Sequence, residues 1–198
     1  MVKTQSGFAN RPLDKKDSTV LYPNITTCIR GGGDLATGVA YRLLRAGFPV
    51  IILELPQPLV IRRTVAFAQA VYAGTMEVND IQARRAGSAA EALELAQTGL
   101  VPVMVDPAGT AIARLKPAIV VDARLLKRNP GDLKRKHAPL VIALGPGFRA
   151  GVDCQAVIET NRGHNLGRVI WQGKAEPNTG TPGDIAGFSA QRVLRAPA

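Results

Sequence analysis

A glycine-rich turn with the spacing of a dinucleotide-binding motif lies near the start of the chain. Residues 31–36 read Gly-Gly-Gly-Asp-Leu-Ala and match the pattern G-x-G-x-x-A. In that pattern the first glycine allows a tight turn, the second lets a phosphate approach the backbone, and the small third residue lets helix and strand pack closely. The N–H groups at the start of the following helix then attract an anion. The candidate cofactor-binding residues of this turn are Gly31, Gly32, Gly33, Asp34, Leu35 and Ala36.

An acidic residue stands where a site of this type holds a ribose. Glu54 ends the next apolar segment, 21 residues after Gly33, and its carboxylate can accept hydrogen bonds from ribose hydroxyl groups. A carboxylate there favours NAD over NADP, because it repels a 2′-phosphate. Asp34 fits less well, since a carboxylate at a helix start competes with phosphate for the same N–H groups. The alternative is a glycine-rich turn in an α/β fold that binds no nucleotide.

A second glycine-rich loop follows a buried apolar segment. Gly145, Pro146 and Gly147 come directly after residues 140–144, and Arg149 stands beside them. Ligands of open α/β sheets bind at the carboxyl ends of the strands, and the N–H groups of such a loop can form a nest for an anion. We therefore count these three loop residues among the candidate cofactor-binding residues. The alternative is a plain loop that needs glycine for a positive φ.

Polar side chains are dense just after another short strand. Glu159, Asn161, Arg162 and His164 fall within six positions. We take Glu159, Arg162 and His164 as candidate catalytic residues, and Asn161 and Arg162 as cofactor contacts. A histidine can act as a general acid or base near neutral pH. The alternative is a polar hairpin turn. No metal site is predicted, because no second histidine or cysteine lies at ligand spacing.

Arginines at several strand ends predict a phosphate-binding cleft, because a guanidinium matches phosphate with two parallel hydrogen bonds. The candidates are Arg62, Arg63, Arg124 and Arg149, of which we assign Arg62 and Arg63 to the cofactor site. The basic run over residues 127–137 is instead expected to be a solvated loop. No aromatic residue interleaves with it, which argues against nucleic-acid binding.

Composition limits the class of protein. The 198 residues leave room for one domain with a short appendage, and a net charge of +10 favours an anionic partner without identifying it. The chain has no apolar run of about 18 residues, so we expect no membrane span. Its start lacks the apolar core of a signal peptide, so we expect a cytoplasmic protein, which we also expect to form a homo-oligomer.

The two cysteines are far apart in the sequence. They argue against a disulfide scaffold and fit a reducing compartment. We expect Cys28 to lie in the core, within a strand, and Cys154 to be the more exposed thiol, in a loop.

Short β-branched segments alternate with helical ones, which predicts an α/β fold with a Rossmann-like, mostly parallel sheet. Strands are expected over residues 25–30, 49–54, 101–105, 118–122 and 140–144, a hairpin over 75–85, and helices over 35–46, 63–72 and 88–98. Further short strands over 156–160, 166–171 and 191–194 predict a β-rich C-terminal extension. We therefore divide the chain into a mobile arm (1–24), a cofactor-binding domain (25–150) and this extension (151–198), and expect the chain to be truncated.

Taken together, these motifs resemble the YqeB-type family, accessory proteins of selenium-dependent molybdenum hydroxylases. The likeness covers residues 25–197 and is carried by residues 31–38, 54–56, 62–65, 67–68, 144–148, 151–153, 158–164 and 166–170. The family is distantly similar to the Rossmann domain of XdhC-type molybdenum-cofactor chaperones. One departure is the middle position of the triplet after Arg30, where Gly32 stands although Gly-Ala-Gly is expected.

The resemblance implies a role in maturing or inserting a molybdopterin cofactor. The ligand would be a molybdopterin dinucleotide or an NAD-like nucleotide, and the protein partner a molybdenum hydroxylase. The residues near 196–197 would lead into a further β-rich segment. Two alternatives stay open: an NAD-dependent oxidoreductase, and a non-catalytic module that docks an acidic enzyme through its basic surface.

Overall fold

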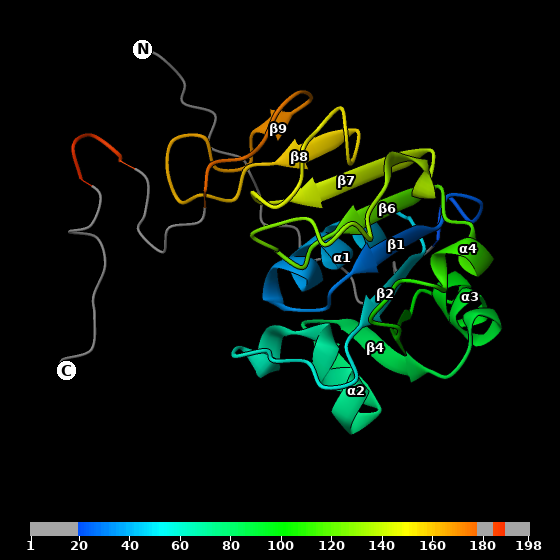
Figure 1. Ribbon diagram of the computed structural model, residues 1–198. Coiled ribbons are helices and arrows are strands. Elements are labelled where there is room, and N and C mark those ends of the chain that lie inside the picture. Colours follow the sequence, from blue (N-terminus) through cyan, green and yellow to red (C-terminus); the bar gives the residue numbers. More distant parts are fainter. Residues whose placement is uncertain (1–19, 178–183, 189–198) are drawn as a thin grey trace, which may run out of the picture.

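A computed structural model describes residues 20–177 and 184–188, in which one mixed sheet carries helices on both faces (Figure 1). The strands are β1 (Thr27–Arg30), β2 (Val50–Glu54), β3 (Thr75–Val78), β4 (Ile81–Ala86), β5 (Val101–Val105), β6 (Ile119–Asp122), β7 (Leu140–Leu144), β8 (Ala156–Ile158) and β9 (Val169–Ile170). The helices are α1 (Asp34–Arg45), α2 (Ala70–Ala73), α3 (Ala89–Gln97) and α4 (Ile112–Leu115), with 3₁₀ turns η1 (Arg63–Val65), η2 (Phe67–Gln69) and η3 (Arg135–His137). The expected α/β fold is confirmed.

The strand order places a crevice beside β1. The order is β3-β4-β5-β2-β1-β6-β7-β8-β9, parallel except for the antiparallel pairs β3–β4 and β8–β9 at the two edges (Figure 1). After β1 the chain builds the sheet outward on the β2 side, and it later returns to build on the β6 side. Loops that leave β1 and β6 therefore diverge, and such a switch point is where open α/β sheets bind ligands.

The core lies in two layers, one on each face of the sheet. On one face α1 and α2 pack against residues such as Ile29 and Ile52. On the other face α3 and α4 pack against residues such as Cys28 and Ile51. Because the central strands are covered on both faces, they are rich in buried β-branched residues. This is the pattern from which the sequence predicted them. No helix in the described ranges is long and apolar enough to cross a membrane.

The prediction of a single helix over residues 63–72 is wrong. The structure has η1, η2 and α2 in its place, and Ala66 between η1 and η2 is extended, with φ −128° and ψ 118°. The N–H of Phe67 donates to Thr37 Oγ1 and the N–H of Ala68 donates to Gly32 O, each at 2.9 Å. A continuous helix would use these donors internally. The segment is instead tied to the glycine turn.

The two ends of the chain are only partly described. β8 pairs in parallel with β7, and β9 pairs with β8, so residues 156–170 continue the same sheet. At the other end, the N–H groups of Leu21 and Tyr22 donate to Gly47 O, at 2.9 and 3.0 Å. The strand expected over 191–194 and most of the expected arm, residues 1–19, lie outside the described residues. The domain boundaries stay a prediction.

Candidate functional site

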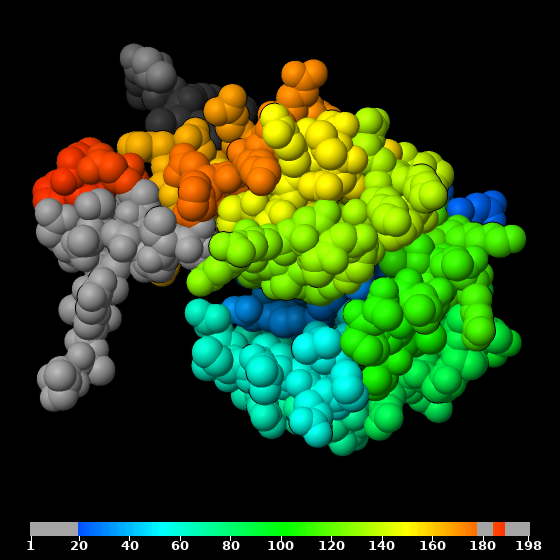
Figure 2. Space-filling model, viewed as in Figure 1, coloured from blue at the N-terminus to red at the C-terminus, as the bar shows by residue number. Residues whose placement is uncertain are grey.

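A cavity of about 470 Å³ opens at the carboxyl ends of β1, β2, β5 and β6. In Figure 2 it is a groove between the cyan segment that follows β2 and the yellow-green segment that follows β6, with blue residues of the α1 region inside. Of the sequence-predicted residues, those that line it are Gly31, Gly33, Asp34, Leu35, Ala36, Glu54, Arg62 and Arg124. The first glycine turn and Glu54 are thus brought to one place.

The three glycines of the turn differ in what surrounds them. Gly31 has a φ of +91°, which favours glycine, and a side chain there would lie 3.3 Å from the Cγ of Arg124. Gly32 packs on the backbone of Ala68, since an added Cβ would lie 3.0 Å from Ala68 N. Gly33 faces open space, because its added Cβ would meet only a Val60 methyl group at 3.9 Å. The turn is held in place by its first two residues and is open at the third.

The start of α1 presents unused hydrogen-bond donors. Gly33 is the residue before the helix, and no side chain there caps it. No hydrogen bond among the described residues uses the N–H of Gly33, Asp34, Leu35 or Ala36. These groups belong to the first turn, where the helix dipole favours negative charge. The start of α1 can therefore receive an anion.

Glu54 is oriented toward the turn, as the motif requires. Its side chain is buried, Oε2 accepts the N–H of Gly32, and Oε1 accepts the N–H of Leu55, each at 2.6 Å. A carboxylate offers about four acceptor sites, so two remain for a ligand. Glu54 occupies one amide of the glycine turn and leaves the donors of α1 open.

The two arginines assigned to the cofactor site differ in their surroundings. Arg62 lines the cavity and donates to Asp34 Oδ2 at 2.7 Å. The Asp34 carboxylate accepts from Arg62 in this contact, and no hydrogen bond among the described residues joins it to the N–H groups of α1. Arg63 does not line the cavity, and its guanidinium lies over the Tyr72 ring at 5.1 Å.

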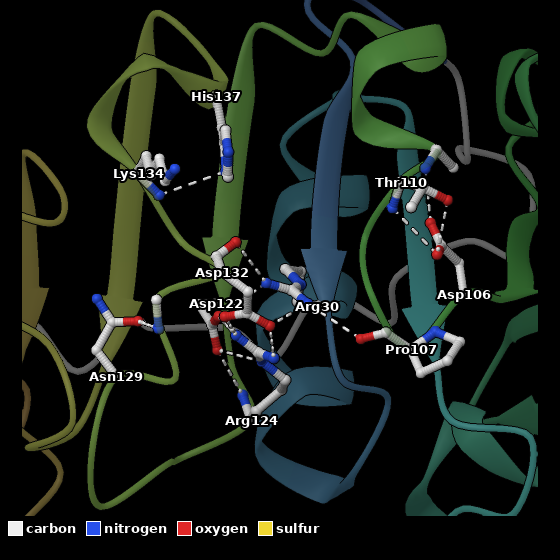
Figure 3. Close-up of polar contacts among 12 residues, drawn as sticks. Arg30, Asp106, Pro107, Thr110, Asp122, Arg124, Asn129, Asp132, Lys134 and His137 are labelled. Carbon is white, nitrogen blue, oxygen red and sulfur yellow. Dashed lines mark hydrogen bonds and ion pairs between the residues drawn. The ribbon is translucent and has the colours of Figure 1, made fainter.

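A partly buried ionic cluster lies at the same end of the sheet and joins Arg30, Asp122, Arg124 and Asp132 (Figure 3). Arg30 is 1% exposed and donates to Asp132 Oδ2 at 2.8 Å and to Pro107 O at 3.1 Å. Arg124 donates to both oxygens of Asp132 at 2.8 Å and to Asp122. The hydrogen bonds from Arg124 hold the pKa of Asp132 well below its usual range.

Arg30 was not among the residues that sequence reasoning selected, although it lines the cavity. Its signal in the sequence is a charged residue at the end of an otherwise uncharged strand, directly before the glycine turn. Arg124 was selected as a phosphate contact, and here its partners are Asp122 and Asp132. Burial lowers the pKa of Arg124, but the hydrogen bonds to Asp132 and Asp122 outweigh burial, so the pKa is raised.

The second glycine loop lies outside the cavity lining, together with Arg149. Gly145 has a φ of +82°, and an added Cβ would lie 3.1 Å from Thr160 Oγ1. At Gly147 an added Cβ would overlap the carbonyl oxygen of Leu126. Pro146 lies between these two contacts. The positive φ and the nearby Thr160 account for Gly145, and close packing against the segment that follows β6 accounts for Gly147.

The polar turn after β8 also lies outside the cavity lining. Glu159 is 3% exposed, and its two oxygens accept the N–H groups of Asn161 and Glu176, each at 2.8 Å. The Asn161 side chain donates to the Glu176 carboxylate, which lowers the pKa of Glu176. His164 and Arg162 are exposed. Glu159 therefore stabilises the loop through these hydrogen bonds. The structure does not bring the polar residues of this turn to the glycine turn.

The expectation that Cys154 is the more exposed thiol is wrong. Both Cys28 and Cys154 are 0% exposed. The sequence Gly-Val-Asp before Cys154 indicated a loop, but the Cys154 backbone bridges to Ala150 and its side chain packs in the core. In the part of the chain that the structure describes, no three His, Cys, Asp or Glu residues are grouped as metal ligands.

A protein of Escherichia coli (strain K12) described as "Uncharacterized protein YqeB" is 59% identical to this chain over 170 residues. The resemblance to the YqeB-type family is confirmed. The match covers 86% of this chain but 31% of that relative, so the chain spans about a third of its relative's length. No family model and no solved structure matches the chain.

Proposed function

We propose that the chain binds an anionic, nucleotide-like ligand in the cavity beside β1. The observation that carries the proposal is that two complementary groups face one cavity: the N–H donors at the start of α1 and the carboxylate of Glu54. A phosphate would take the donors, and ribose hydroxyl groups would take the two acceptor sites that remain on Glu54.

The remaining walls suit a flat ring system. The lining includes the apolar side chains of Leu35, Leu53, Leu55, Val60 and Leu125. Ligand sites are commonly apolar with a few placed polar groups. A nucleobase or a pterin has this mixture of a flat apolar face and a polar edge, so both classes fit the cavity.

We place this binding in the maturation or insertion of a molybdopterin-type cofactor for a selenium-dependent molybdenum hydroxylase. The support is the YqeB-type resemblance, together with a ligand class that is phosphate-rich and anionic. The molybdenum hydroxylase is the proposed protein partner, attracted by the net charge of +10. The same cavity also suits NAD, because Glu54 ends β2 beside the glycine turn, where NAD-binding sites hold a ribose, and this favours an oxidoreductase as the second candidate.

The test combines native mass spectrometry with titration. Protein purified from its own host is expected to carry a phosphate-bearing small molecule, and the emptied protein is expected to bind NAD⁺ or a pterin dinucleotide. In Gly33→Val the new side chain enters the cavity, while the backbone keeps an allowed φ of −66°. This variant should fold normally and lose the ligand.

The matched control is Gly38→Val. Gly38 lies on the exposed side of α1, and an added Cβ meets nothing within 4 Å. This variant should keep the ligand. Retention of the ligand by Gly33→Val would show that the glycine turn is not the binding site. Binding of added NADH by the emptied protein, seen as a change in nicotinamide fluorescence, without binding of a pterin dinucleotide, would favour the oxidoreductase.

A further inference from the structure

Two arginines meet the cavity beside the glycine turn. Arg30 ends β1 and Arg124 follows β6, and both line the cavity. The stem of Arg124 runs past Gly31, since a Cβ on Gly31 would lie 3.3 Å from the Arg124 Cγ. Groups that bind one phosphate at the start of α1 are therefore next to groups that can bind another anion.

The two carboxylates that neutralise these arginines have different settings. Asp122 is the last residue of β6, in the middle of the sheet, and its side chain is 0% exposed. Asp132 lies in the segment between β6 and η3, which has no helix or strand, and its side chain is 30% exposed (Figure 3). Asp122 is thus a fixed part of the sheet, whereas Asp132 reaches the arginines from a loop.

We propose that Arg30 and Arg124 form a second anion subsite, which the carboxylate of Asp132 occupies until the ligand arrives. This inference rests on the proposed function and specifies its ligand class as a diphosphate-containing molecule. One phosphate binds the N–H groups of α1, and the second replaces Asp132 between the two guanidinium groups. Phosphate can reproduce the two parallel hydrogen bonds that Arg124 now makes to Asp132.

Charge balance supports the exchange. With Asp132 in place, two arginines face two carboxylates and the cluster is neutral. Without Asp132 the cluster carries one uncompensated positive charge in a largely buried setting, which is strongly unfavourable until another anion fills the place. The low pKa of Asp132 keeps it ionised at neutral pH. It therefore competes with an incoming phosphate rather than yielding by protonation.

The decisive variant is Asp132→Asn, with inorganic pyrophosphate as the probe in isothermal titration. Removing the resident charge should tighten pyrophosphate binding about tenfold or more over the unsubstituted chain. The matched control is Asp80→Asn, which removes a loop carboxylate paired with Arg45 away from the cavity. This control should bind pyrophosphate as the unsubstituted chain does. Equal or weaker binding by Asp132→Asn, or no binding by any of the three proteins, overturns the subsite.

A second measurement needs no substitution. Pyrophosphate added to the unsubstituted chain should speed amide hydrogen exchange at residues 131–134, because the loop loses its anchor, and slow exchange at residues 33–36. Unchanged or slower exchange at residues 131–134 overturns the proposal, even where Asp132→Asn does not fold. If Gly33→Val abolishes nucleotide binding while Asp132→Asn gains nothing, the subsite alone fails. If Gly33→Val binds nucleotide normally, the proposed function fails.

Discussion

The thiols of Cys28 and Cys154 are unreactive because both side chains are buried. Burial raises the pKa of the Cys28 thiol to about 12 and that of the Cys154 thiol to about 11. Only a thiolate attacks a disulfide reagent. At pH 8 the thiols of the native protein should therefore react slowly with dithiobis(nitrobenzoate). In the denatured protein both thiols should react at once and release two equivalents of thionitrobenzoate. A native thiol that reacts at the denatured rate would contradict the structure.

Residues of the site differ in how far the sequence reveals them. The position of Glu54 beside the glycine turn could be predicted, because it depends on a fixed spacing from Gly33 along one β-α-β unit. Arg30 and Asp132 could not, because their contact joins residues 102 positions apart and depends on where a loop returns. The burial of Cys154 was missed for a related reason. A local Gly-Val-Asp sequence indicates a turn but not which side chain of the turn enters the core.

At the scale of elements, the glycine turn is attached to the segment of η2. Gly32 O accepts the N–H of Ala68, and Thr37 Oγ1 accepts the N–H of Phe67. The strands and α1 could be predicted from short apolar patterns. A strand that is buried on both faces shows a run of apolar residues, and a helix that is buried along one side shows apolar residues at helical spacing. The broken helix could not be, because its backbone donors are satisfied by residues about 30 positions earlier.

This attachment predicts different effects for two neighbouring glycines. Gly32→Ala should lower the free energy of unfolding by about 1–3 kcal/mol, because the new methyl group presses on the Ala68 backbone. Gly33→Ala should change it by less than about 1 kcal/mol, because its φ of −66° suits alanine while glycine is the better residue directly before a helix. Urea unfolding of both variants checks this. Equal effects at the two positions would mean that Gly32 is not packed as described.

At the scale of the whole molecule, the ionic cluster joins the two halves of the sheet. Arg30 comes from β1, Arg124 and Asp122 from the end of β6, and Asp132 from the loop before η3. Pro107, which follows β5, adds its carbonyl oxygen from the β2 side. The alternation of strands and helices could be predicted, but the strand order that places the switch point beside β1 could not. Arg124 could be selected from the sequence, but its pairing with Asp132 could not, because that contact depends on where the loop before η3 lies.

This cluster also gives stability a particular dependence on pH. The folded-state pKa of Asp132 lies below its ordinary value of 3.8, so its contribution is present above that value and is lost as the pH falls. Asp132→Asn lacks the contribution at every pH. The difference in free energy of unfolding between the two proteins should therefore stay constant from pH 7 to about pH 5 and shrink below about pH 4. Carboxyl groups outside the cluster titrate in both proteins and cancel in the difference. Urea titrations of both proteins at several pH values measure it directly, and a difference that persists unchanged to about pH 3 would show that Asp132 is not held by Arg30 and Arg124 in solution.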